Sequence, residues 1–385
     1  MPLTVLMNAG PWAALPPPGY GGIEAVVSSI VTELRRVGIR VVLATVGEST
    51  LAADRSISVF ERGQFAHIAD PYNLGMGIAH AHMQAVVAEL ERNEEIDLVH
   101  DHLEVVGPSV LRAMPADAPP VLQTLHWNLR KHPDFYGRFD GGNRVFFAGV
   151  SQRQVDLAPE RLRRHVVGVV PLGVATDRYR PSPRKADHLL VLARVTEDKG
   201  QDVAVRLCRE LGLELIMAGP VGGLRSPEEL ADSIASNHRD VAFYRERVQP
   251  LEDEDRRWIG SVGGAEKDEL LASARALLCP IRWEEPGGTA VVEALASGTP
   301  VVGYRRGCLP SLVEHGVTGF LADDERELAG YLERLDELDP VACRAAALTS
   351  GSAELMAQRY LGLYADVLRR AAGPPVLDEA TSKTA

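Results

Sequence analysis

Short apolar runs alternate with amphipathic stretches of helical spacing along most of this chain, and that alternation limits the possible folds more than any other feature. Strands separated by helices are typical of a parallel sheet in an α/β protein. The chain has 385 residues, which is room for two such domains. The apolar runs that we expect to be strands are residues 3–8, 40–46, 97–100, 121–125, 146–150, 188–193, 213–218, 276–281 and 301–304.

The segment 166–182 contains Pro and Gly and predicts the link between two halves. We therefore predict a first α/β domain over residues 1–170 and a second over residues 171–351. One apolar face over residues 352–372 predicts a final helix. The Pro-rich, polar segment 373–385 predicts a disordered tail.

Two further segments have a helical character. Residues 23–36 repeat apolar side chains at helical spacing, and Gly38 follows as a stop. Residues 221–262 carry many charges and few strand signals, so we expect one or two helices there.

The overall charge and the cysteines exclude several classes of function. The net charge of −12 argues against a nucleic acid or an anionic membrane as the main partner. The four cysteines have neither metal-binding nor redox spacing, so we expect no metal centre and a reduced, cytoplasmic setting. No run of about 18 apolar residues occurs, so we predict no transmembrane segment. An anionic substrate would therefore have to meet a few local cations.

Candidate site residues of the first half follow predicted strands, and ligands of parallel sheets bind at the carboxyl ends of strands. Gly21 and Gly22 lead into helix 23–36, where the backbone can approach a ligand and the helix amino end favours an anion. An ordinary flexible loop is the alternative. His126 follows strand 121–125 and is either a ligand contact or a structural histidine. The sequence His-Asp-His at 100–102 supplies at most part of a metal shell, so we predict no metal there.

In the second half, Arg194 ends a strand and Lys199 opens the next helix, so one loop carries two cations that could clamp a diphosphate. The alternative is two solvated side chains. Glu293 lies in an apolar helix expected from Thr289 to Ser297, where an unpaired carboxylate would be destabilising. The two hydroxyls of a ribose would compensate it, and the alternatives are a structural salt bridge or a narrow solvated stripe along the helix. Glu285 precedes that helix in a glycine turn, beside the backbone amides of Gly287 to Ala290.

Taken together, these motifs resemble the retaining, nucleotide-sugar-dependent glycosyltransferases of the GT-B fold, family 4, also called glycosyl transferases group 1. The resemblance covers nearly the whole chain. Its most specific part is the pair of glutamates eight positions apart within residues 283–302, and residues 17–24, 124–126, 193–200 and 316–321 also match. Within the family, the chain is similar to the branch that includes transferases of oligosaccharide-antibiotic pathways.

The resemblance implies two facing Rossmann-like domains with a cleft between them and a final helix that crosses back to the first domain. It places Gly21 and Gly22 against the donor diphosphate or the transferred sugar. Arg194 and Lys199 would neutralise the leaving diphosphate, and Glu293 would hold the ribose hydroxyls.

The resemblance also implies that Glu285 and His126 contact the transferred sugar near the reacting centre. The backbone of Gly287, Gly288 and Thr289 would contact the donor. Relatives often have Phe-Gly where this chain has Gly287-Gly288, so we expect a looser loop and a less fixed Glu285.

The implied activity is transfer of a sugar from a nucleotide sugar to a hydroxyl of a small-molecule or saccharide acceptor. The nucleotide sugar is a co-substrate, and no cofactor or metal is expected. Acceptor recognition would fall to loops of the first domain. The alternatives are a nucleotide-sugar epimerase or a phosphorylase of the same fold, and a non-catalytic nucleotide-sugar-binding protein. The sequence does not identify the donor base, the sugar, the acceptor or the oligomeric state.

Overall fold

The structure is a computed structural model, and it describes residues 2–19, 21–68, 72–92, 95–182, 184–233 and 238–373. The tail predicted to be disordered lies outside the described residues from position 374 onward.

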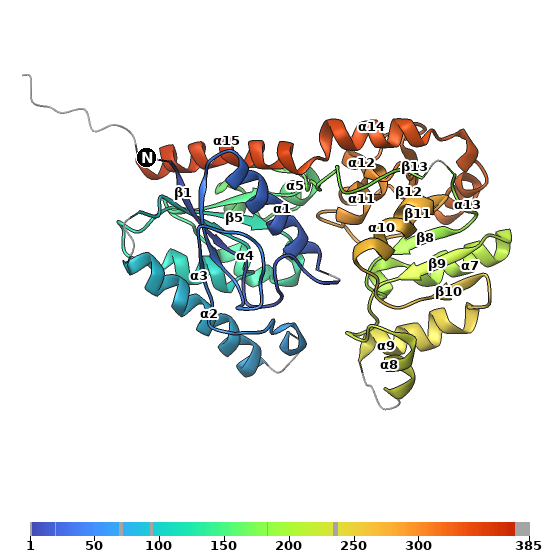
Figure 1. Ribbon diagram of the computed structural model, residues 1–385, viewed down its shortest axis with the longest axis horizontal. Coiled ribbons are helices and arrows are strands. Elements are labelled where there is room, and N and C mark those ends of the chain that lie inside the picture. Colours follow the sequence, from blue (N-terminus) through green and yellow to red (C-terminus); the bar gives the residue numbers. More distant parts are fainter. Residues whose placement is uncertain are drawn as a thin grey trace, which may run out of the picture.

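Two separate parallel sheets form the framework of the molecule (Figure 1). The first has the order β3-β2-β1-β4-β5-β6-β7, and the second has the order β10-β9-β8-β11-β12-β13. Most of their strands are buried along their whole length, as expected where helices cover both faces of a parallel sheet. The strands are β1 Thr4–Asn8, β2 Arg40–Ala44, β3 Arg55–Ile57, β4 Leu98–Asp101, β5 Val121–Leu125, β6 Val145–Gly149, β7 Val166–Val169, β8 Leu189–Leu192, β9 Leu215–Ala218, β10 Arg256–Trp258, β11 Ala276–Cys279, β12 Val301–Tyr304 and β13 Gly319–Ala322.

All nine predicted strands are confirmed, and β3, β7, β10 and β13 were missed. Strands β3 and β10 read Arg-Ser-Ile and Arg-Arg-Trp, so they lack the apolar run that marks a buried strand. The strand β7 lies at the start of the segment predicted as a link. It pairs with β6 as the last strand of the first sheet.

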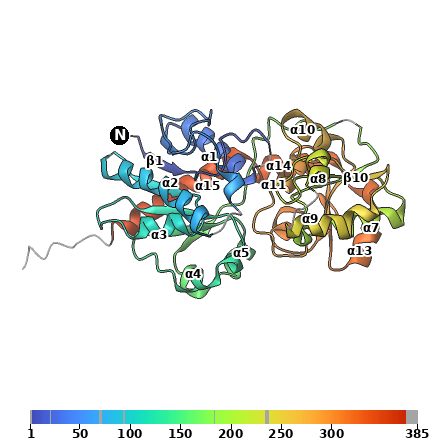
Figure 2. The same cartoon turned by 90° about the horizontal axis from the view of Figure 1, so that it is seen from below.

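The helices lie on the faces of the two sheets (Figures 1 and 2). Those of the N-terminal half are α1 Gly22–Arg36, α2 Tyr72–Arg92, α3 Val106–Arg112, α4 Pro133–Arg138, α5 Gln152–Asp156 and α6 Glu160–Arg163. Those that follow are α7 Gln201–Leu211, α8 Pro227–Asp232, α9 Arg239–Phe243, α10 Gly264–Ser273, α11 Thr289–Ala296, α12 Leu309–Leu312, α13 Glu325–Leu332, α14 Pro340–Ser350 and α15 Ala353–Ala371. The helices expected within residues 221–262 are α8 and α9, although β10 also lies there.

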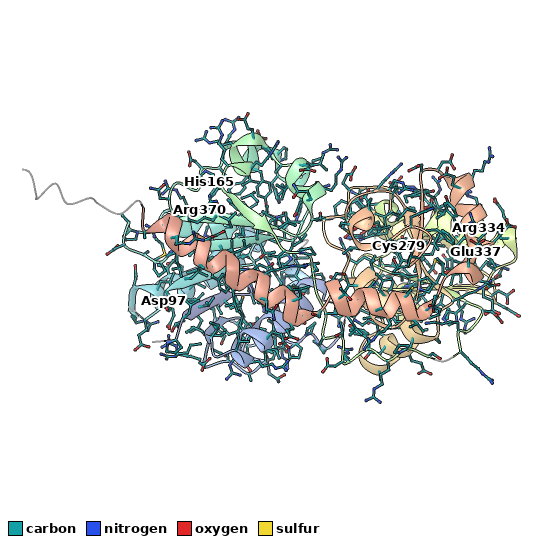
Figure 3. The ribbon with its side chains drawn as sticks, turned by 90° about the horizontal axis from the view of Figure 1, so that it is seen from above. Asp97, His165, Cys279, Arg334, Glu337 and Arg370 are labelled. Carbon is teal, nitrogen blue, oxygen red and sulfur yellow. The ribbon has the colours of Figure 1, made fainter. Side chains whose placement is uncertain are left out.

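The final helix α15 crosses back from the second half to the first (Figures 1 and 3). Its Tyr360 hydroxyl lies 2.9 Å from Thr124 Oγ1, and its Tyr364 hydroxyl lies 2.8 Å from His100 Nδ1. Both tyrosines are fully buried. The helix is therefore part of the N-terminal core, as predicted.

Loops from the carboxyl ends of the two sheets contact one another. Arg153, after β6, forms an ion pair with Glu284, after β11. A Cβ on Gly263, after β10, would lie 3.1 Å from the Cα of Gly19, in the loop after β1. The strand ends that carry the candidate motifs thus face each other across the junction of the two halves.

Candidate functional site

The loop after β8 carries both predicted cations. Gly200 ends this loop with φ +74°, and a Cβ there would lie 2.2 Å from the carbonyl oxygen of Pro280. Only glycine fits that conformation and that approach, so the β8 loop is held closely against the segment after β11. This packing places the Lys199 ammonium in contact with the Glu285 carboxylate and 5.6 Å from the centre of the Trp283 ring.

Arg194 lies on the same loop but is exposed. Its backbone carbonyl accepts a hydrogen bond from Gln201 Nε2 (2.9 Å), which fixes the loop. Within the described part of the chain, its guanidinium has no hydrogen-bond or ion-pair partner. It is therefore available to an anion at the strand ends.

The loop that carries Glu285 is tightly packed, which corrects the expectation that the Gly-Gly sequence loosens it. The Cys308 amide donates to the Glu285 carbonyl (2.8 Å). A Cβ on Gly287 would lie 2.6 Å from Leu172 Cδ1, and a Cβ on Gly288 would lie 2.8 Å from Cys308 Sγ. Each glycine therefore allows a close contact, and the two do not leave the loop free.

Glu293 is buried in α11, as predicted, and it has partners within the protein. Its Oε1 accepts a hydrogen bond from the Tyr179 hydroxyl (2.8 Å) and one from the Lys267 ammonium (2.7 Å). Burial and the nearby carboxylate raise the pKa of Tyr179, so this hydroxyl remains a donor. Part of what compensates the Glu293 carboxylate is thus a structural salt bridge, one of the alternatives left open by the sequence.

Both partners of Glu293 lie far from it in the sequence, so sequence reasoning missed them. Among the described contacts, none involves Glu293 Oε2. That oxygen keeps its capacity to accept a hydrogen bond from a ligand hydroxyl.

The amino end of α11 has free donors. The Gly288 carbonyl accepts from the amides of Val291 and Val292, which closes the first turn. Among the described backbone hydrogen bonds, none uses the amides of Gly288, Thr289 or Ala290 as donors. Such amides, with the positive end of the helix dipole, favour an anion.

His126 is half-buried and adjoins the two buried imidazoles of His100 and His102 in the first half. Its Nε2 lies 2.7 Å from His102 Nδ1, and the rings of His100 and His102 are 4.2 Å apart. Burial lowers the pKa of His126 to about 3 and that of His100 to about 3, so both are neutral near pH 7. Asp101, the residue after His100 in β4, is fully buried, and burial raises its pKa to about 7. A neutral His126 can hydrogen-bond a hydroxyl but supplies no positive charge.

Each group of the His-Asp-His segment is used by the protein itself. His100 contacts Tyr364 and Thr124, and Asp101 accepts hydrogen bonds from Asn8 and Gln123. In the part of the chain that the structure describes, no group of three or more His, Cys, Asp or Glu side chains is placed to hold a metal ion.

Gly21 and Gly22 lie where the loop after β1 becomes α1. A Cβ on Gly21 would lie 2.8 Å from Pro17 Cβ, so a larger residue would displace the proline loop. Gly22 has open space on the side where a Cβ would project. Backbone can therefore be approached at Gly22, as the sequence predicts.

The described contacts join only some of the predicted residues. Lys199 and Glu285 touch directly. Glu293 lies in α11, the helix that follows Glu285, and its carboxylate contacts Tyr179 and Lys267. No described side-chain contact joins His126 to the second half.

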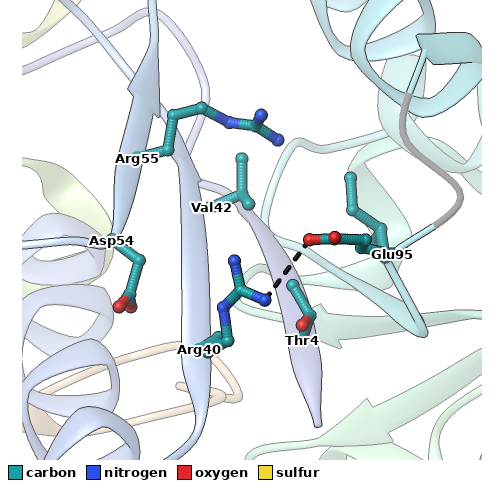
Figure 4. A pocket seen from close by; sticks show the side chains of 7 residues that line it. Thr4, Arg40, Val42, Asp54, Arg55 and Glu95 are labelled. Carbon is teal, nitrogen blue, oxygen red and sulfur yellow. Dashed lines mark hydrogen bonds and ion pairs between the residues drawn. The ribbon is translucent and has the colours of Figure 1, made fainter. Parts of the chain in front are cut away.

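Two recesses lie away from these strand ends. One, of about 150 Å³, is at the amino ends of β1, β2 and β3, where Arg40 points toward Glu95 (3.3 Å; Figure 4). The other, of about 310 Å³, is lined by Tyr244, Trp258 and residues of α8. Arg40 and Arg55 of the first recess are both paired with glutamates, so that recess offers no free cation to a ligand.

Comparisons with known proteins agree with this arrangement. Residues 20–178 match the family model described as Glycosyltransferase Family 4, and residues 177–345 match the one described as Glycosyl transferases group 1. The alpha-maltose-1-phosphate synthase of Mycobacterium tuberculosis (strain CDC 1551 / Oshkosh) is 27% identical over 358 residues, covering 84% of this chain and 86% of the relative.

Solved structures give the same result. AviGT4, a glycosyltransferase involved in avilamycin A biosynthesis, superposes with a TM-score of 0.62 at 26% identity and covers 97% of this chain and 99% of its own. Anabaena HepE in complex with UDP-glucose has a TM-score of 0.64 at 18% identity, over 94% of this chain and all of HepE, which shows the shared fold.

The two sheets and their crossing helix define a GT-B glycosyltransferase. The two family models together span residues 20–345, and the chain belongs to the family 4 glycosyltransferases, group 1. The resemblance inferred from the sequence is confirmed. Among the described residues, none forms a helix that is long and apolar enough to span a membrane.

Proposed function

We propose that this protein is a retaining glycosyltransferase that moves a sugar from a nucleoside-diphosphate sugar to a hydroxyl of a small-molecule or saccharide acceptor. The observation that carries the proposal is the convergence at the strand ends of the second sheet. There the exposed Arg194, the contact between Lys199 and Glu285, and the free amides at the start of α11 lie on adjoining loops. HepE, which has the same fold, was solved with UDP-glucose, and this supports a nucleotide-sugar donor.

The proposed roles follow from charge. Arg194, Lys199 and the amides of Gly288 and Thr289 stabilise the negative charge that develops on the leaving diphosphate. The Glu285 carboxylate, held by Lys199, accepts hydrogen bonds from hydroxyls of the transferred sugar.

Two further contacts belong to the proposed donor site. Glu293 Oε2 accepts a hydrogen bond from a ribose hydroxyl, while Oε1 stays bound to Tyr179 and Lys267. His126, which is neutral, contacts the sugar from the first half, and Gly21 and Gly22 lie against the donor.

In the proposed reaction the bond from the anomeric carbon to the phosphate oxygen breaks, and the acceptor oxygen forms a bond on the same face. The acceptor proton passes to a donor phosphate oxygen, so no side-chain base is required. Cationic side chains and helix amides take the place of a divalent metal in this proposal. Closure of the two halves would exclude water and limit hydrolysis of the donor.

A thermal-shift screen with UDP-, GDP-, ADP- and dTDP-sugars tests the donor class. A ligand at 100 times its Kd stabilises the fold by about 2.7 kcal/mol, which is readily measured. Proton NMR of the glycoside then reports whether the anomeric configuration is retained, and turnover with EDTA reports metal dependence. An inverted product or a loss of turnover with EDTA would contradict the proposed mechanism. An epimer formed from the donor alone would favour an epimerase.

A further inference from the structure

A bidentate ion pair joins the two halves one residue away from Glu285. Arg153 lies in α5, after β6 of the first sheet, and Figure 1 shows α5 on the side of the first half that faces the second. Its Nε lies 3.0 Å from Glu284 Oε2, and its Nη2 lies 2.9 Å from Glu284 Oε1. Two parallel hydrogen bonds of this kind attract the two side chains and also fix their relative orientation.

The second half also holds the Glu284 carboxylate. The Gly307 amide donates to Glu284 Oε2 (2.9 Å). The Arg153 guanidinium lowers the pKa of Glu284, so the carboxylate is ionised near pH 7. Glu284 therefore links a backbone amide of its own half to a guanidinium of the other half.

The backbone of Gly307 and Cys308 also holds Glu285, the next residue. The Cys308 amide donates to the Glu285 carbonyl, and a Cβ on Gly307 would lie 2.3 Å from the Glu285 nitrogen. Gly287, two residues on, packs against Leu172. A movement of the first half relative to the second would thus pull on this loop through Arg153.

Fold stability does not account for this pair. The two side chains are 50% and 29% exposed, and exposed ion pairs contribute little to folding. A pair that contributes little to stability and joins the two halves is suited to fixing their relative position.

We infer that Arg153 is a positioning residue of the transferase: through Glu284 it sets the pose of Glu285, so that the sugar-binding carboxylate is aligned when the two halves are together. The inference rests on the proposed function. Arg153 acts through Glu284 and contacts neither the donor nor the reacting atoms.

The test compares Arg153→Gln, Glu284→Gln and the charge-swapped double variant Arg153→Glu/Glu284→Arg with the wild type. Arg161→Gln is the matched control, since Arg161 forms an exposed ion pair with Asp140 (3.0 Å) inside the first half. The readouts are the Kd of UDP, the Kd of UDP-glucose, and the kcat and KM of donor hydrolysis. If the thermal-shift screen gives a larger shift with another nucleotide sugar, that nucleotide sugar and its nucleoside diphosphate are used in place of UDP-glucose and UDP.

We expect the two single variants to lower kcat about 10-fold, since a displaced contact group slows the reaction without unfolding the site. The ratio of the Kd of UDP to the Kd of UDP-glucose measures how much the sugar adds to affinity, and this ratio should also fall. The Kd of UDP itself should not change. The charge-swapped double variant should recover part of the kcat and part of the affinity ratio. Arg161→Gln should match the wild type.

Two outcomes would overturn the inference, and they can be told apart. If the wild type binds a nucleotide sugar but both single variants keep its kcat and its affinity ratio within 2-fold, Arg153 has no positioning role. If the wild type binds no nucleotide sugar, the proposed function fails and this inference falls with it.

Discussion

Glu293 shows what a single residue can and cannot reveal in the sequence. Its place in an apolar helix predicts a buried carboxylate that needs a partner, and it is buried. The partners Tyr179 and Lys267 lie on other segments, 114 and 26 positions away. Which polar side chain reaches a buried carboxylate depends on how helices pack, and one sequence carries no direct signal of that.

Glu293→Ala should lower the free energy of unfolding by about 2–3 kcal/mol, because it leaves a part-buried ammonium and a buried hydroxyl without their acceptor. Urea unfolding measures the change. The exposed Glu266, in the first turn of α10, provides the control Glu266→Ala, which should stay within about 0.5 kcal/mol of the wild type. Equal stability of the two variants would show that the contacts of Glu293 contribute nothing.

Among the elements, the strands that were predicted are apolar runs, whereas β3 and β10 lack such a run and the short, buried β13, Gly-Phe-Leu-Ala, was also missed. Strands β3 and β10 carry arginines, and they exist because β2 and β9 offer them edges to pair with. The Gly287-Gly288 turn was expected to be loose and is tightly packed instead. Glycine predicts a flexible loop, but here its missing side chain allows close packing on Leu172 and Cys308.

Gly288→Ala should disturb the start of α11. Gly288 has φ +119°, and a Cβ there would lie 2.8 Å from Cys308 Sγ and 2.9 Å from Leu312 Cδ1. We expect a loss of about 1–3 kcal/mol in unfolding free energy and weaker binding of the nucleoside diphosphate.

Gly330→Ala is the control for that substitution, since Gly330 lies inside α13 with open space around it. There the change should stabilise the fold by about 0.5–1 kcal/mol. Both can be measured by urea unfolding and by titration calorimetry. A Gly288→Ala variant as stable and as tight-binding as the wild type would contradict the packing described for this turn.

For the whole molecule, the alternating pattern predicted the two sheets and the family resemblance implied the returning helix, whereas neither indicated which residues of the two halves meet. The ion pair of Arg153 with Glu284 and the approach of Gly19 to Gly263 each join residues more than 100 positions apart. The ends of parallel strands predict where a site lies, but not which side chains meet there.

The buried imidazoles make the whole fold sensitive to acid. Burial lowers the pKa of His82 to about 4 and that of His100 and His126 to about 3, whereas an unfolded histidine titrates near about 6.5. Below about pH 6.5 these histidines bind protons in the unfolded chain but stay neutral in the folded chain. Each histidine then lowers stability by up to about 1.4 kcal/mol per pH unit until its folded pKa is reached.

Asp101 acts in the opposite direction. Burial raises its pKa to about 7, so its contribution is present at low pH and is lost as the pH rises from about 4 to about 7. Three histidines outweigh one carboxyl group, so the unfolding free energy should fall from pH 6.5 to pH 5. Urea unfolding at several pH values measures this, and a stability that stays constant or rises over that interval would contradict the burial of these groups.

The loop after β8 carries the two cations, Arg194 and Lys199, that we propose stabilise a leaving diphosphate. The most direct measurement is the turnover of the preferred nucleotide sugar by Arg194→Ala and Lys199→Ala, with the exposed Arg209→Ala of α7 as control. Each site variant should lose at least about 100-fold in kcat, as expected for the loss of a main contact to developing charge, and the control should not change. Near-normal turnover in both site variants would show that neither cation stabilises the leaving group.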